Sequence, residues 1–269
     1  MDEQRLLNAC RLQDEGKFTE AYNEFIQISD SSADRLDKAG ALLYAARTLE
    51  ISGKCEAATT QLSAVRALLE DYPKSERDEE FAALERFLDF EDANLFWLRG
   101  ENPEAALDRF EAALKKHRLP LKDPRSNDFY VAIQTRRAFV LADLGRWKEA
   151  LPILEGITSP QEYEEGIAFY LGHCYVEAGD YHRAEEKLTE ALKLRLPGHL
   201  EYRAHCELGT TYYYLENYSK AKEEFEKGAD KADPIYIKEC QIWKWLEMTC
   251  RALGLNPEAE QYAQMARPS

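Results

Sequence analysis

The sequence lacks several features that would assign a protein class at once. No apolar run approaches the ~18 residues of a membrane-spanning helix, and the opening MDEQRLLNAC has neither the basic stretch nor the apolar core of a secretory signal. Basic residues are few as well, with 35 Lys and Arg against 50 Asp and Glu and a formal net charge of -15. From the missing apolar segments we expect a soluble cytoplasmic protein. Because an acidic surface repels phosphate backbones and anionic lipids, we also expect it to bind neither nucleic acid nor membrane.

Motifs that carry chemistry are also missing. The sequence contains no G-x-S-x-G elbow, no H-E-x-x-H and no glycine-rich phosphate loop. Its six cysteines form no C-x-x-C pair, and we expect them to be reduced thiols packed within helices. The His-Cys neighbours at 173–174 and 205–206 would point about 100° apart on a helix, so they cannot both face one metal ion. We therefore predict no enzyme, with no catalytic residues, no cofactor and no metal site.

Internal repetition is what the sequence does have. The segments LGHCYVEAGDYHRAEEKLTEAL (171–192) and LGTTYYYLENYSKAKEEFEKGA (208–229) share their small and aromatic positions while their charged residues differ. Seven such copies can be aligned, starting near residues 2, 39, 87, 131, 165, 202 and 240. The twentieth position is alanine in every copy: Ala21, Ala58, Ala106, Ala150, Ala184, Ala221 and Ala259. Since packed helices approach closely only where a side chain is small, we interpret the pattern as a repeated helix–helix contact.

Turn residues divide each copy into two helices. The end of the first helix carries a residue suited to the left-handed C-cap conformation, namely Gly16, Gly53, Gly100, Gly145, Gly179, Asn217 and Gly254. Asn102 and Asn256 each precede a proline, which predicts an N-cap at the start of a second helix. The eighth position is small except at Asn94 and Glu247, where we expect looser packing. Each copy is therefore predicted to be a helical hairpin.

These hairpins resemble the tetratricopeptide repeat, through the alanine, the aromatic residue after the turn (Phe18, Trp147, Tyr181, Tyr218) and Trp243. The resemblance covers residues 2 to about 266. It implies an all-α fold, an α-solenoid that forms a right-handed superhelix of about seven helix-turn-helix repeats, as a single domain over residues 1–269. The two longest steps between copies, from residue 39 to 87 and from 87 to 131, far exceed the family's ~34 residues, and we place insertions near residues 71–80 and 118–128.

The resemblance also implies a function. In such solenoids the first helix of each repeat lines a concave wall that binds other proteins, so we expect a scaffold or adapter that binds a segment of a partner protein. A domain that senses a peptide or effector is the alternative, and homo-oligomerisation is possible but not required. The family's groove positions transfer to these candidate partner-binding residues: Arg47, Arg136, Phe139, Phe169, Tyr170, His173, Arg203, Tyr213, Trp245 and Arg251. The same positions hold these acidic residues: Glu50, Glu91, Asp92, Asp143, Glu177 and Glu207.

A packing role competes with a binding role at each aromatic candidate. Arg and aromatic residues dominate binding hot spots, yet aromatics of stacked helices are more often buried in the core. We expect Phe139 and Tyr214 to lie in the core. Phe169, Tyr213 and Trp245 stay open between the core and the groove.

Two further positions test specific functions of the family. His173 has a carboxylate one turn later, Glu177, and this spacing is typical of a structural pair on a helix surface. The clamp that holds the tails of heat-shock chaperones uses a lysine and an asparagine in the first helix, and Leu6 and Cys10 occupy those places here. Chaperone-tail binding is therefore disfavoured.

Overall fold

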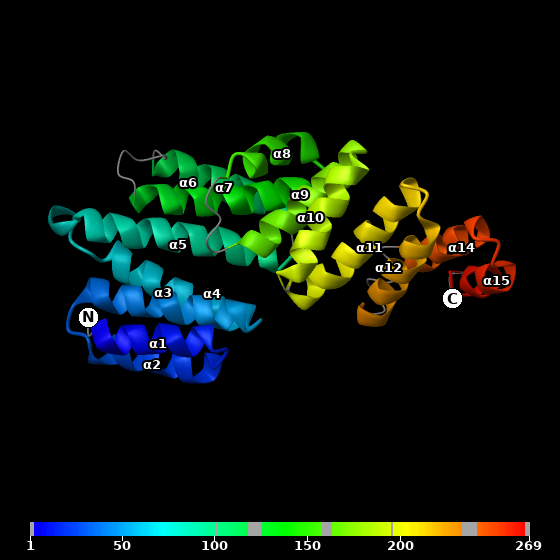
Figure 1. Ribbon diagram of the computed structural model, residues 1–269. Coiled ribbons are helices and arrows are strands. Elements are labelled where there is room, and N and C mark those ends of the chain that lie inside the picture. The colour runs from blue at the N-terminus through cyan, green and yellow to red at the C-terminus, as the bar shows by residue number, and fades with distance from the viewer. Residues whose placement is uncertain are drawn as a thin grey trace. The chain divides into compact units, whose positions relative to one another are not determined.

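The fold is all-α in the part of the chain that the structure describes. The computed structural model (Figure 1) describes residues 3–100, 102–117, 125–157, 163–194, 196–232 and 241–266. Within these ranges the backbone forms α-helices and one short 3-10 helix, and no strand. The helices are paired by short turns, which confirms the expected α-solenoid of helix-turn-helix repeats. The chain divides into two compact units, residues 1–140 and 141–269, and each is described by itself.

The first unit is a stack of antiparallel hairpins. Its elements are α1 (Glu3–Asp14), α2 (Phe18–Ser31), α3 (Arg35–Ile51), α4 (Cys55–Glu70), the 3-10 helix η1 (Lys74–Glu76), α5 (Glu79–Leu98), α6 (Pro103–Lys116) and most of α7 (Arg125–Asp143). Each helix from α1 to α5 packs against the next one along the chain, and α3 also contacts α5. The first helices of the second and third hairpins thus lie side by side.

The second unit repeats this arrangement. It contains the end of α7 and then α8 (Trp147–Glu155), α9 (Glu164–Ala178), α10 (Tyr181–Lys193), α11 (Gly198–Tyr214), α12 (Tyr218–Lys231), α14 (Ile242–Ala252) and α15 (Asn256–Met265). Besides the contacts within each hairpin, α9 touches α11 and α11 touches α14. These three first helices therefore form one layer, and any surface they share is built from three hairpins.

The repeated small residues mark the closest helix contacts, as the sequence predicts. All seven alanines of the twentieth position are buried, with at most 1% of their surface exposed. A Cβ added at Gly172 would lie 2.6 Å from Cγ of Leu188, and one added at Gly209 would lie 2.8 Å from Cδ1 of Phe225. No side chain larger than hydrogen fits there without displacing the facing helix.

The turns confirm most of the predicted caps. The glycines at residues 16, 53, 100, 145, 179 and 254 all have φ between 67° and 77°. In the remaining turn the prediction is wrong by one residue, because Glu216 takes the left-handed conformation (φ 59°) and Asn217 caps α12 instead. Asn102 caps α6 as expected. Asn256 is already helical, and Leu255 precedes it at the N-cap without a side-chain cap bond.

Extra length between copies is found partly in the first helices. α5 has 20 residues and α7 has 19, and the proposed insertion at 71–80 holds a turn, η1 and the first residues of α5. The other proposed insertion, 118–128, lies outside the described residues up to 124 and then enters α7. The single domain over residues 1–269 and the seven starting positions stay predictions.

The cysteines and the hydropathy of the helices complete this description. Cys174, Cys206 and Cys250 are buried, Cys10 and Cys55 are half-buried, and all five are free thiols, whereas residue 240 lies outside the described ranges. None of the helices described here is both long and apolar enough to cross a lipid bilayer.

Candidate functional site

All ten candidate partner-binding residues lie on first helices. In the first unit they are Arg47 on α3 and Arg136 and Phe139 on α7. In the second unit they are Phe169, Tyr170 and His173 on α9, Arg203 and Tyr213 on α11, and Trp245 and Arg251 on α14. Because α9, α11 and α14 are neighbours, the larger group belongs to one layer.

Three of the candidate rings are buried. Phe139, Phe169 and Tyr170 expose 2%, 0% and 1% of their surface, so Phe139 belongs to the core as expected, and none of the three presents a ring to solvent. Their role as ligand contacts stays a prediction. Tyr214 was expected in the core and is instead 53% exposed. It is the last residue of α11 and stacks on Tyr181 of α10, with ring centroids 4.8 Å apart.

Arg203 ties three helices together. Its guanidinium lies 3.2 Å from Oδ1 of Asp143, the last residue of α7, and 5.1 Å from the centre of the Phe169 ring on α9. The Tyr170 hydroxyl donates to the other Asp143 oxygen at 3.1 Å. Burial by itself would lower the pKa of Arg203, but Tyr170 and Asp143 outweigh burial and raise it. Arg203 is therefore a permanently charged, positioned group at the face of α9 and α11.

His173 pairs with a different carboxylate from the one predicted. Its Nδ1 lies 2.8 Å from Oε1 of Glu207, which belongs to α11 and not to its own helix. Glu177 also raises the pKa of His173, but its charge is a smaller cause than Glu207. Burial lowers the pKa of His173, yet the Glu207 carboxylate more than offsets burial, so the pKa is raised. Burial next to Glu207 also raises the pKa of Cys174 to about 12, which makes that thiol unreactive.

We call a second group of rings the aromatic cluster; Tyr214 is its exposed member and the other rings are half-buried. It consists of Tyr181, Tyr213, Tyr214, Tyr218 and Trp245. Tyr213 meets Trp245 edge to face with centroids 5.5 Å apart, and Tyr214 meets the same indole at 6.2 Å. The back of Trp245 stacks on the buried Phe225 at 5.7 Å. The indole is thus held by the core on one side and joined to the exposed Tyr214 on the other.

The remaining candidate of this unit, Arg251, lies on the exposed surface of α14. It forms an ion pair with Glu247 one turn earlier at 2.7 Å. The Glu247 side chain is only 18% exposed, so the polar residue that breaks the small-residue rule is satisfied by a local partner.

The first unit has a buried polar group on α3, α5 and α7. Asn94 on α5 donates to Oε1 of Glu50 on α3 at 2.5 Å, and Asn94 and Glu91 are each 2% exposed. Burial and then the neighbouring Glu91 raise the pKa of Glu50 well above its ordinary value, while Arg136 and Arg47 oppose the rise. The candidate residues Arg47 and Arg136 thus partly offset the negative charge of the Glu50 and Glu91 carboxyl groups. Asn94 breaks the small-residue rule because its amide serves this pair.

Metal chemistry finds no support in the described ranges. No three His, Cys, Asp or Glu side chains among these residues are arranged to hold a metal ion. His205, one of the residues considered for such a site, instead lies 2.7 Å from a Glu224 oxygen. No sequence pattern had indicated that pair, because its members come from different helices.

Comparison with known proteins identifies the repeat and the fold. A family model described as tetratricopeptide repeat matches residues 202–230. The solved structure of the APC/C hetero-tetramer Cut9-Hcn1 superimposes with a TM-score of 0.63 at 14% identity, over 97% of this chain and 45% of that one. The Rap protein complexed with competence and sporulation factor gives 0.63 at 13% identity, over 97% and 74%. A tetratricopeptide repeat protein from Parabacteroides merdae gives 0.51 at 13% identity, over 98% and 91%.

Identities this low establish a shared fold and nothing finer, and this chain spans less than half of the Cut9-Hcn1 chain that it matches. No curated protein matches the sequence. The matched residues, 202–230, run through most of the α11–α12 hairpin, and the neighbouring hairpins share its alanine and its turn. The α11–α12 hairpin thus matches a tetratricopeptide repeat, and the chain shares the fold of solved tetratricopeptide-repeat structures.

Proposed function

We propose that this protein is an interaction scaffold that binds a segment of a partner protein on the layer formed by α9, α11 and α14. The aromatic cluster is the contact surface in this proposal, and Tyr214 and Trp245 are its centre. A role in protein interaction in general follows from the tetratricopeptide-repeat fold. The location of the contact is our inference from the exposed ring of Tyr214.

The exposure of Tyr214 carries the proposal. A large aromatic side chain that is 53% exposed loses little further freedom on binding, since stacking on Tyr181 and the edge contact with Trp245 already orient it. Tyr and Trp are the residues most enriched in binding hot spots. A partner that covers these rings gains apolar burial without first having to order them.

The other candidates have supporting roles in this proposal. Arg203 and His173 are polar groups of the same layer, each held by a carboxylate of a neighbouring helix. Phe169 and Tyr170 support Arg203, since its guanidinium lies over the Phe169 ring and Tyr170 shares its Asp143 partner. Arg47, Arg136 and Phe139 belong to the first unit, where we propose a separate, weaker contact that does not depend on the second unit. Arg251 is an exposed charge at the edge of α14.

The test is site-specific photo-crosslinking. A benzophenone analogue of phenylalanine placed at residue 214 should crosslink the protein that the wild type captures from its own cell lysate, and the Tyr214→Ser variant should lose that protein. Met265→Ser is the matched control, since Met265 is 46% exposed in the same unit but lies at the end of α15. Capture by Tyr214→Ser at the wild-type level, with both variants folded by circular dichroism, would reject the aromatic cluster as the contact.

A short peptide is the alternative ligand for the same layer. The observation that favours it is the likeness to Rap, whose structure was determined in complex with competence and sporulation factor. In this reading the ligand regulates a second partner, so binding should change the radius of gyration in solution scattering. A scaffold that holds a partner segment without rearrangement predicts no such change.

A further inference from the structure

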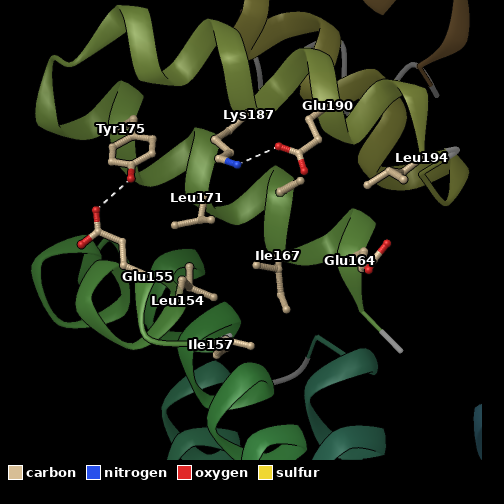
Figure 2. A pocket seen from close by; sticks show the side chains of 11 residues that line it. Leu154, Glu155, Ile157, Glu164, Ile167, Leu171, Tyr175, Lys187, Glu190 and Leu194 are labelled. Atoms are coloured by element: carbon tan, nitrogen blue, oxygen red, sulfur yellow. Dashed lines mark hydrogen bonds and ion pairs between the residues drawn. The ribbon is translucent and has the colours of Figure 1, made fainter. Parts of the chain in front are cut away.

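The second unit contains a pocket that the aromatic cluster does not use. It lies between α8, α9 and α10 and has a volume of about 420 Å³ (Figure 2), which falls within the range of ordinary ligand sites. Its residues on α9 are Glu164, Ile167, Ala168, Leu171 and Tyr175. These residues lie on a different face of α9 from Tyr170 and His173. The pocket and the proposed partner surface are therefore different sites.

The pocket exists because one second helix is short. α8 has nine residues, whereas α10 and α12 have 13 and 14. Pro152 interrupts its hydrogen bonding from inside, and the helix ends at Glu155 with Gly156 as its C-cap. The end of α8 borders the pocket, since Leu154, Glu155 and Ile157 all line it.

The walls of the pocket are aliphatic. Leu154 of α8 and Ile167 and Leu171 of α9 are at most 8% exposed, and Figure 2 shows them around the open space. Leu194, directly after α10, stands at the mouth and is 39% exposed. An exposed leucine next to an open aliphatic wall is apolar surface, and a ligand that covers it gains hydrophobic stabilisation in proportion to the area buried.

The rim of the pocket is acidic. Lys187 donates to Glu190 at 2.7 Å, and the Tyr175 hydroxyl donates to Glu155 at 2.8 Å, as the dashed lines of Figure 2 mark. Glu164, the third carboxylate, is exposed at the N-terminal end of α9 and has no hydrogen bond or ion pair within the described part of the chain. Glu155 also forms an ion pair with Arg183 at 3.4 Å, and Lys187 is paired with Glu190, so Glu164 is the carboxylate of this rim that is left to receive a cation from a ligand.

We propose that this pocket binds an aliphatic side chain of a partner protein, with a neighbouring lysine or arginine of the same partner placed on Glu164. Apolar burial in the pocket supplies the attraction, and the acidic rim selects the charge beside it. A segment in which the aliphatic residue is followed by an acidic one is repelled by the same rim. The site is independent of the aromatic cluster and remains even if the partner surface proposed above is wrong.

Saturation-transfer difference NMR on the full chain tests the proposal with two blocked dipeptides, leucyl-lysine and leucyl-glutamate. The leucine methyl signals of leucyl-lysine should receive saturation from the wild type, and those of leucyl-glutamate should receive less. Glu164→Gln should weaken leucyl-lysine binding by roughly two- to fivefold, the range of an exposed ion pair. Glu165→Gln is the matched control, since Glu165 is the next residue of α9 and does not line the pocket.

A second variant separates the pocket from other apolar surfaces. Ala168→Met places a longer side chain in the pocket and should remove the leucine signal, with thermal denaturation confirming the fold. Tyr214→Ser should leave the signal unchanged. No saturation transfer to the wild type, equal signals from the two dipeptides, or loss of signal in Tyr214→Ser would each overturn the pocket as the binding site.

Discussion

Replacing Gly172 with alanine tests whether the repeated small residues are obligatory. Gly172 lies on α9 at the point where α10 crosses it, and the new Cβ would lie 2.6 Å from Cγ, 2.8 Å from Cδ2 and 3.2 Å from the backbone nitrogen of Leu188. Cβ atoms in real proteins essentially never approach a heavy atom this closely. Leu188 is completely buried, so its side chain has no room to move aside and α10 must shift.

The expected loss of stability is about 2 kcal/mol. Overpacking a close contact costs roughly 1–3 kcal/mol, and the backbone nitrogen among the clashing atoms places this case toward the upper end. Alanine recovers up to about 1 kcal/mol of helix propensity relative to glycine. The packing cost is the larger of the two, so the free energy of unfolding should fall despite the better helix former.

Gly198→Ala is the control for this measurement. Gly198 begins α11, its φ is not positive, and an added Cβ meets nothing within 4 Å. This variant should therefore be unchanged or stabilised by at most about 1 kcal/mol. Urea denaturation followed by circular dichroism compares both variants with the wild type.

A double variant tests the contact directly. Leu188→Ala alone should cost about 2–5 kcal/mol by leaving a cavity, and it should cost less in the Gly172→Ala background because the new methyl group occupies part of that space. Such contacting pairs show coupling energies of about 0.5–3 kcal/mol. A Gly172→Ala protein as stable as the wild type, or two substitutions whose costs simply add, would refute the close-contact reasoning.

Two further predictions concern titration. The raised pKa of Glu50 favours the folded state at low pH, and this contribution to stability is lost as pH rises through the folded pKa. Glu50→Gln should therefore raise the free energy of unfolding at pH 8 and do so much less at pH 4. An equal effect at both pH values would contradict a buried carboxyl pair with Glu91. The raised pKa of His173 likewise contributes stability that is complete below the unfolded value of about 6.5 and is lost as pH rises through the folded pKa. Glu207→Gln should lower the His173 pKa, followed by NMR of the imidazole, while Glu177→Gln should lower it less; the opposite order would mean that the partner of His173 is on its own helix.

The hairpins could be predicted because each one is specified by neighbours in sequence. Six first helices are followed by a glycine with φ near 70°, a conformation that glycine adopts without strain. The alanine of the twentieth position is required by a contact between two helices that a short turn joins. These constraints recur in every copy, so even an unaligned single sequence displays them. The exception in the sixth copy is also local: Glu216 adopts the left-handed turn and leaves Asn217 to cap α12.

The surfaces could not be predicted to the same depth. Arg203, His173 and Glu207 do lie on neighbouring first helices, but the pairing of His173 with Glu207 depends on the distance between α9 and α11. From the sequence, Asn94 predicts loose packing, whereas in the structure its amide donates a hydrogen bond to Glu50 of another hairpin. Such contacts join residues of different repeats, and no periodicity in the sequence records which atoms meet.

By itself, the sequence determined that the chain folds as helical hairpins, where each helix turns and which small residues let the helices touch. The tertiary structure alone decided that Tyr214 is exposed while Phe169 is buried, and that the short α8 opens a pocket beside α9 and α10. The physical reason is the range of the interactions. Turns and hairpin contacts depend on residues close in the chain, whereas exposure and cavities depend on how the next hairpin is placed.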